Sequence, residues 1–169
     1  MKAFSPSWYA NATPGMLEPD KEAVGRAKVF LLAKWRERAA ERGDGVPVDL
    51  SRACKFSSLF TKIVFGGSIA GNRDHQFVVS CDGSVIDLNA EARDVVALPH
   101  AYRAEPGFIG NDEHHLSMKS CVPRVKKWAK EFLAAESARG TQVLLPEVPS
   151  LRGVPAPVVM AEVDTVKAR

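Results

Sequence analysis

The sequence lacks any apolar run of the length that a membrane span requires. Its opening segment, MKAFSPSWYANATPGM, carries one lysine and no continuous apolar stretch, so it does not have the pattern of a secretory signal. We therefore expect a cytoplasmic protein that has no membrane as a partner.

Cysteine is also scarce. Cys54, Cys81 and Cys121 are the only three, and they form no C-x-x-C pair. An odd number without such a pair argues against a disulfide framework and against a structural zinc site, so we expect reduced thiols and no bound metal.

An excess of charge of one sign is missing as well. Lys plus Arg number 23 and Asp plus Glu 20, and this net charge of +3 gives no reason to expect nucleic acid as a partner. Gly66-Gly67 and Gly71-Asn72 lack the residues that complete a phosphate loop or a dinucleotide fingerprint, so we interpret them as turns and expect no cofactor. The 169 residues show no internal repeat, and 46% hydrophobic residues can form one core. We expect a single domain over 1–169.

Hydrophobic periodicity and turn residues predict an α+β chain. The expected elements are an irregular N-terminal arm at 1–17, a helix from Pro19 to Arg42, a helix capped by Ser51 and ended by Gly66-Gly67, strands at 74–80 and 84–89, a short strand at 95–98, a polar loop to 119 and a helix from Pro123 to Gly140. The Pro-rich C-terminal segment at 146–169 is either an extended arm or a set of edge strands (142–145 and 158–163).

Three residues within 35 positions carry the best clue to chemistry: Cys54, His75 and Asp87. A thiol reacts as its thiolate, which a helix N-terminus and an imidazole both favour, while a carboxylate orients the imidazole. If Ser51 caps its helix, Cys54 lies in the first turn, where unpaired amide groups also favour an oxyanion. The helix rises roughly 17 Å from Cys54 to its end at about 1.5 Å per residue. The return to His75 spans at most about 26 Å at about 3.3 Å per residue, so His75 can come back to the level of Cys54.

The register of the expected hairpin decides whether Asp87 can join them. A two-residue turn at Asp82-Gly83 would put Asp87 on the face opposite to His75. A three-residue loop, with Gly83 at positive φ, pairs Val79 with Val85 and puts His75 and Asp87 on one face as diagonal neighbours. We expect this second register, with Phe77, Val79 and Val85 packed against the helix of Cys54, and Gln76, Val78, Ile86 and Leu88 directed toward the long helices. Asn89 shares the face of His75 and is a second candidate to orient the imidazole, after Asp87.

The order of a Cys at a helix start, a His on one strand and an Asp on the next, in DHQFVVSCDGSVIDLN, resembles the core of the papain-like cysteine peptidase superfamily, particularly its transglutaminase-like and cell-wall peptidase branches. The resemblance covers 51–89. It implies an antiparallel sheet packed against a helix that bears the cysteine at its N-terminus, and the periodicity of the chain adds two longer helices that flank this core. It also implies that Cys54 is the nucleophile, His75 the base and Asp87 its orienting acid. We therefore expect a hydrolase or acyltransferase acting on an amide, isopeptide or thioester bond of a small-molecule or peptide substrate.

Other interpretations remain open at this point. Cys54 can simply fill core volume, and the chain can be a non-catalytic protein-interaction domain on the same scaffold. The run Asp112-Glu113-His114-His115 contains metal-ligand residue types, but adjacent side chains rarely converge on one ion, so a solvated polar loop is favoured over a metal site. Cys81 is expected to be exposed in the hairpin turn. Cys121, near the expected start of the last helix, is either a weak cap or a second reactive thiol.

Overall fold

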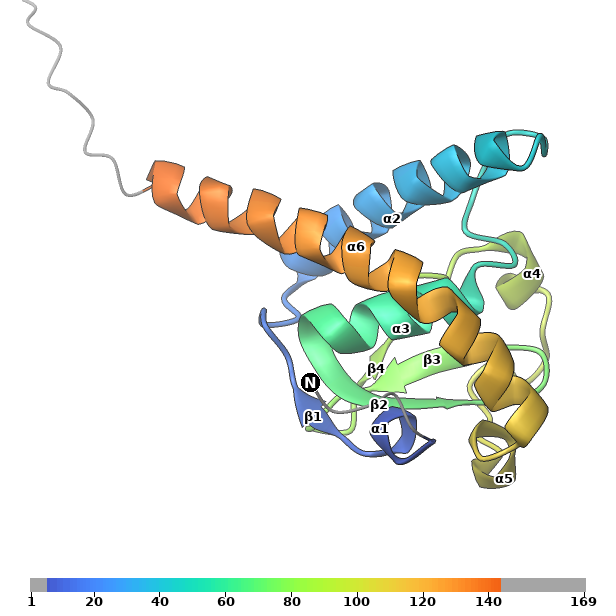
Figure 1. Ribbon diagram of the computed structural model, residues 1–169. Coiled ribbons are helices and arrows are strands. Elements are labelled where there is room, and N and C mark those ends of the chain that lie inside the picture. Colours follow the sequence, from blue (N-terminus) through green and yellow to red (C-terminus); the bar gives the residue numbers. More distant parts are fainter. Residues whose placement is uncertain (1–5, 144–169) are drawn as a thin grey trace, which may run out of the picture.

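The computed structural model describes residues 6–143 and shows an α+β fold (Figure 1). Its helices are α1 (Pro6–Ala10), α2 (Lys21–Glu41), α3 (Cys54–Phe65), α4 (Arg93–Val96), α5 (Pro106–Ile109) and α6 (Asp112–Val143). Its strands, β1 (Thr13–Pro14), β2 (Gly66–Gly71), β3 (Gln76–Val79) and β4 (Val85–Ile86), form an antiparallel sheet in the order β1-β2-β3-β4. The expected C-terminal arm at 146–169 lies outside the described residues.

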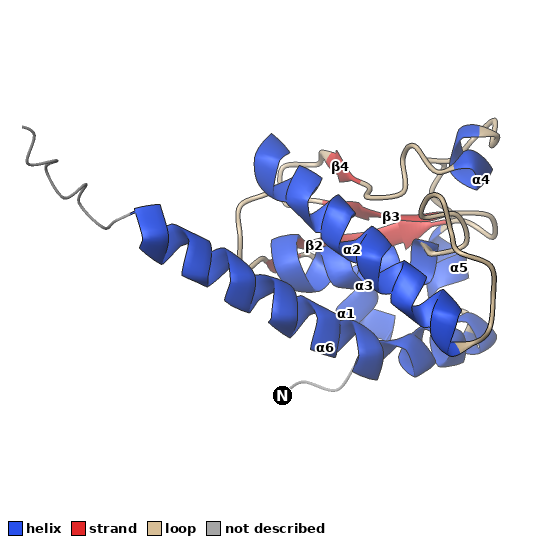
Figure 2. Ribbon diagram, turned by 90° about the horizontal axis from the view of Figure 1, so that it is seen from above, coloured by secondary structure: helices blue, strands red, loops and turns tan. Residues whose placement is uncertain are grey.

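Helix α3 lies between the sheet and the two long helices α2 and α6 (Figures 1 and 2). In this position nearly every side chain after the first turn of α3 is buried. Phe60 of α3 is fully buried and contacts Phe30 of α2 and Phe132 of α6, with ring centroids 5.9 and 5.6 Å away. One apolar core therefore joins the three helices to the sheet.

The β3–β4 hairpin has the register that was expected. Val79 pairs with Val85 and Val78 with Ile86, across the three-residue loop Cys81-Asp82-Gly83. Gly83 has φ +87°, a conformation that glycine adopts without strain. Strand β4 ends at Ile86, earlier than expected, so that Asp87 begins the following turn.

The two sheet faces pack differently from our expectation. Three side chains of one face lie in the core cluster together with apolar residues of α2, α3 and α6: Val78, Ile86 and Leu88. The prediction that Phe77, Val79 and Val85 pack against α3 is wrong, since Val85 is 48% exposed and Phe77 contacts the ring of Tyr102 at 5.3 Å. The reason is that α3 occupies the space between the sheet and the long helices, so one face carries the core and a loop covers part of the other.

Strand β2 was not predicted, because its sequence GGSIAG holds three glycines and looks like a turn. Tertiary contact explains these glycines. A Cβ on Gly66 would lie 2.3 Å from the Thr13 carbonyl oxygen of β1, and one on Gly67 would lie 2.4 Å from the Val79 carbonyl oxygen. The neighbouring backbones approach closely enough that only glycine fits at these positions.

The N-terminal arm is more ordered than expected, since it contains α1 and β1. Tyr9 of α1 is 1% exposed, and the buried Lys62 of α3 donates to the Asn11 carbonyl (2.8 Å) and lies over the ring of Trp8. A polar, aromatic segment with little periodicity hides this anchoring from sequence inspection.

Helix α2 begins at Lys21 and not at Pro19, because Asp20 is its N-cap and accepts from the Ala23 N–H (2.8 Å). The short strand expected at 95–98 is also absent; this segment forms α4 and the turn after it. Val95 is buried, and its neighbour Val96 is 68% exposed, which fits one turn of helix.

The last helix, α6, begins at Asp112, eleven residues before the predicted start, and includes Pro123. Asn111 caps it by accepting from the His114 N–H (3.2 Å). A proline inside a helix costs about 3 kcal/mol. The helix continues because its apolar stripe is buried on both sides of the proline, at Met118, Val122, Val125 and Trp128. Because α6 extends to Val143, the edge strand proposed at 142–145 is wrong for its first two residues. Among the helices of the described part, none has the length and apolar character needed to cross a bilayer.

Candidate active site

Cys54 is the first residue of α3, as expected, although the cap is different. Ala53 occupies the N-cap position and no side chain caps the helix; the predicted cap, Ser51, lies in the preceding turn. The amide groups of the first turn therefore have no capping side chain, and the half-buried thiol of Cys54 lies beside them. A helix terminus of this kind favours a thiolate and can donate to a developing oxyanion.

The turn that precedes Cys54 is strained and firmly held. Arg52 has φ +63°, a conformation that residues other than glycine seldom adopt. Three hydrogen bonds from other segments fix this turn: the Arg52 N–H donates to Asp94 Oδ2 (2.7 Å), Asn89 Nδ2 to the Leu50 carbonyl (2.7 Å) and Trp35 Nε1 to the Ser51 carbonyl (3.2 Å). Strain that the surrounding structure maintains is often found at functional sites, and here it sets where α3 begins.

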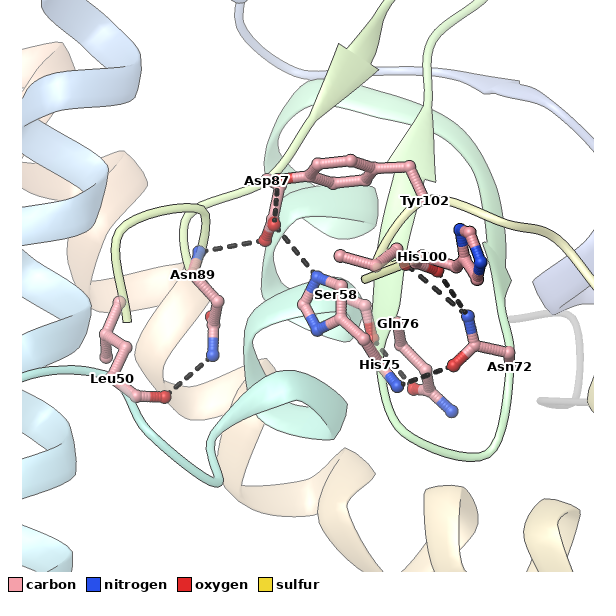
Figure 3. A network of polar contacts seen from close by, with 10 residues as sticks. Leu50, Ser58, Asn72, His75, Gln76, Asp87, Asn89, His100 and Tyr102 are labelled. Atoms are coloured by element: carbon pink, nitrogen blue, oxygen red, sulfur yellow. Dashed lines mark hydrogen bonds and ion pairs between the residues drawn. The ribbon is translucent and has the colours of Figure 1, made fainter. Parts of the chain in front are cut away.

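His75 directly precedes β3 and contacts Asp87, which directly follows β4 (Figure 3). The distance from His75 Nε2 to Asp87 Oδ2 is 2.9 Å, and the two side chains are 0% and 3% exposed. The hairpin register brings them together, because it places both on one face of the sheet. With Nε2–H donating to Asp87, Nδ1 is the ring nitrogen that remains for a second partner.

The environment of His75 favours the protonated ring. Burial by itself lowers the pKa of His75, but the hydrogen bond and charge of Asp87, together with the nearby thiol of Cys54, outweigh burial and raise the pKa to about 9. His75 Nδ1 is buried and makes no ordinary hydrogen bond to any described residue. Cys54 is nevertheless near enough to affect the proton affinity of the ring, so the three predicted residues meet in one site.

Asp87 accepts from three donors, of which the sequence predicted only His75. Its Oδ2 accepts from His75 and from the hydroxyl of Tyr102 (3.0 Å), and its Oδ1 accepts from the Asn89 N–H (2.8 Å). Burial, followed by the charge of Asp87, raises the pKa of Tyr102 to about 12, so this hydroxyl keeps its proton and remains a donor. The Asn89 side chain is turned away to Leu50, so Asp87 and not Asn89 contacts the imidazole.

Asn72 connects the turn before His75 to the loop that carries Tyr102 (Figure 3). Its Oδ1 accepts from the His75 N–H (3.0 Å), and its Nδ2 donates to the carbonyls of Arg103 (2.8 Å) and His100 (3.3 Å). One amide therefore positions both the imidazole and the tyrosine. The sequence signals were an Asn in a turn and a tyrosine in a polar loop, and neither pattern specifies a partner 30 residues away.

The run Asp112-Glu113-His114-His115 forms the first turn of α6 and not the solvated loop that was expected. His114 is 7% exposed, contacts Gln76 and lies beside the ring of Phe108. Within residues 6–143, no three His, Cys, Asp or Glu side chains gather in a way that could hold a metal ion. His114 therefore belongs to a buried polar contact between α6 and the sheet.

Of the other two cysteines, Cys121 is near enough to Cys54 for the charges of the two thiols to interact. Cys81 is exposed in the β3–β4 loop, as expected. Cys121 is buried in the interior of α6 and cannot cap it, and burial raises the pKa of its thiol. Only Cys54 has an imidazole–carboxylate pair beside it among the described residues.

Comparison of the chain with protein-family models, with curated proteins and with solved structures finds no match.

The raised pKa of His75 predicts a pH dependence of stability. The folded state holds this proton more tightly than the unfolded state, so the contribution is fully present below about pH 6.5 and is lost as the pH rises through about 9. The buried Lys62, whose pKa burial lowers to about 8, acts in the opposite sense above pH 8. The variant His75→Gln retains Lys62, so comparing it with wild type isolates the effect of His75. We expect the difference in the free energy of unfolding, wild type minus variant, to decrease from pH 6.5 to 9 in urea titrations. A constant difference would contradict the raised pKa.

Proposed function

We propose that this chain is a cysteine-dependent hydrolase or acyltransferase in which Cys54 is the nucleophile, His75 the base and Asp87 the group that orients the base. One observation carries the proposal: a fully buried His75–Asp87 pair at 2.9 Å leaves ring nitrogen Nδ1 without another partner beside the thiol at the start of α3. The order Cys, His, Asp on a helix start and two strand ends also supports a relation to the papain-like superfamily.

The chemistry follows from the geometry. His75 Nδ1 takes the proton of the Cys54 thiol, and Asp87 stabilises the imidazolium that forms. The thiolate attacks the substrate carbonyl, and the free amide groups at the start of α3 donate to the oxyanion. The imidazolium returns its proton to the leaving amine or thiolate, which leaves a thioester on Cys54. Water then releases an acid, or an amine takes the acyl group; we propose a small-molecule or peptide acyl donor.

Selective alkylation tests the proposal. Iodoacetamide should modify Cys54 before Cys121, and before the exposed Cys81 at pH 6.5, because thiolate is the reacting species and only Cys54 has an imidazolium partner among the described residues. Peptide mass spectrometry over a pH series locates the adducts. The variant Cys54→Ser should lose the fast adduct and keep the slow adduct at Cys81. A Cys54 that stays unlabelled until the protein is denatured would instead favour the non-catalytic interaction domain.

A further inference from the structure

A groove with a volume of about 930 Å³ lies beside the proposed site. Three of its lining residues are sequence neighbours of site residues: Lys55 follows Cys54, Arg73 lies two positions before His75, and Arg103 follows Tyr102. The remaining lining comes mainly from α5 and the first turns of α6. The groove therefore borders the segments that carry the reacting groups.

The basic residues of this groove are available to a ligand. Within the described part of the chain, neither Arg73 nor Arg103 forms an ion pair, and Lys55 Nζ donates only to the Ser117 hydroxyl, at 2.6 Å. Both arginines are exposed. Two carboxylates, Glu105 and Glu113, also line the groove. Burial, and then the charge of Lys55, lowers the pKa of His114 and so favours the neutral form of this imidazole.

The two arginines are placed by the same residue that places the base. Asn72 binds the His75 N–H and the Arg103 carbonyl, and Arg73 lies inside this turn. Their backbone positions relative to His75 are therefore fixed before a substrate arrives, so binding has to order only their exposed side chains. Guanidinium groups match carboxylates in a planar, two-hydrogen-bond geometry.

We propose that the groove lined by Lys55, Arg73 and Arg103 binds a carboxylate of the substrate close to the acyl bond that Cys54 attacks. This inference rests on the proposed function. Three cations against two carboxylates leave one net positive charge, which suits a monoanionic carboxylate better than a phosphate monoester with about −1.5 to −2 charges. The substrate is then an acidic acyl compound, such as a peptide with a free carboxylate next to the bond that is broken.

Paired alkylating reagents test this directly. Iodoacetate and iodoacetamide differ in charge and have the same reactive carbon, so the ratio of their rates at Cys54 reports attraction of a carboxylate. In a Cys81→Ser background, the double substitution Arg73→Gln and Arg103→Gln should lower the ratio of the iodoacetate to the iodoacetamide rate at least about threefold. Salt at 0.5 M should lower it similarly in the parent, because it screens exposed charges. Arg139→Gln, which removes one charge at the far end of α6, should leave the ratio unchanged.

The outcomes separate the two proposals. Selective labelling of Cys54 by iodoacetamide with a ratio that neither the double substitution nor salt changes would overturn the carboxylate site and leave the proposed function standing. A Cys54 that reacts with neither reagent would overturn both. Protection of Cys54 from iodoacetamide by succinate, in a manner that depends on the two arginines, supports the carboxylate. Protection by inorganic phosphate and not by succinate overturns that choice of ligand.

Discussion

Replacing His75 with glutamine should slow alkylation of Cys54 by iodoacetamide at pH 6.5 at least about tenfold. The substitution removes the imidazolium that stabilises the thiolate, since Asp87 and Cys54 together raise the pKa of this ring to about 9. The rate is measured by mass spectrometry of the peptide that contains Cys54. Once a substrate is known, its turnover should decrease by about 10²-fold or more.

His100→Ala is the matched control. His100 is exposed and takes part in the site only through its backbone carbonyl, which accepts from Asn72 and which alanine retains. Its alkylation rate should equal that of wild type. Circular dichroism and thermal melting identify any variant that fails to fold. Equal rates for folded His75→Gln and wild type would show that Cys54 does not depend on the imidazole.

Replacing Asp87 with alanine should lower the free energy of unfolding by about 1 to 3 kcal/mol, beyond any effect on reactivity. The carboxylate is 3% exposed and accepts from His75, Tyr102 and the Asn89 N–H, so alanine leaves the buried donors of His75 and Asn89 without this acceptor. Asp87→Asn keeps an acceptor oxygen and should lower the free energy of unfolding by less than Asp87→Ala does. It should still slow alkylation of Cys54, because the negative charge is lost. Urea denaturation at pH 7 measures the difference.

Asp74→Ala serves as the control for this pair. Asp74 is an exposed aspartate one position before His75, and its side chain has no hydrogen bond or ion pair among the described residues. Its stability should stay within about 0.5 kcal/mol of wild type. If Asp87→Ala is equally mild, the buried pair contributes nothing to stability and Asp87 faces solvent in solution.

Local sequence patterns were informative for the parts of the site that depend on contacts between residues close in sequence. Gly83 and the alternation of the two strands limited the hairpin to two registers, and the expected one, with a three-residue loop and a shared face for His75 and Asp87, is the one observed. Residue 54 was correctly placed in a first helical turn, although the cap was not Ser51. These features depend on contacts between residues close in sequence, for which propensity and turn chemistry are good guides.

The features that the sequence could not predict depend on distant partners. The start of α6 was missed because Pro123 looks like a first helical residue, and only the burial of α6 against α3 shows that the helix passes through it. Strand β2 was missed because its glycines are required by the approach of β1 and β3, which local propensity does not report.

The sequence by itself determined the α+β class and the order of Cys54, His75 and Asp87 along the chain, and it limited the hairpin to two registers. The tertiary structure decided which sheet face meets α3 and that the Tyr102 hydroxyl donates to Asp87. It also decided that Asn72 connects the loop of Tyr102 to the turn before His75. The physical reason is the distance along the chain between the residues that interact. Alternation and turns are set within a few residues, whereas a buried carboxylate obtains its donors from whichever segments the core packs beside it.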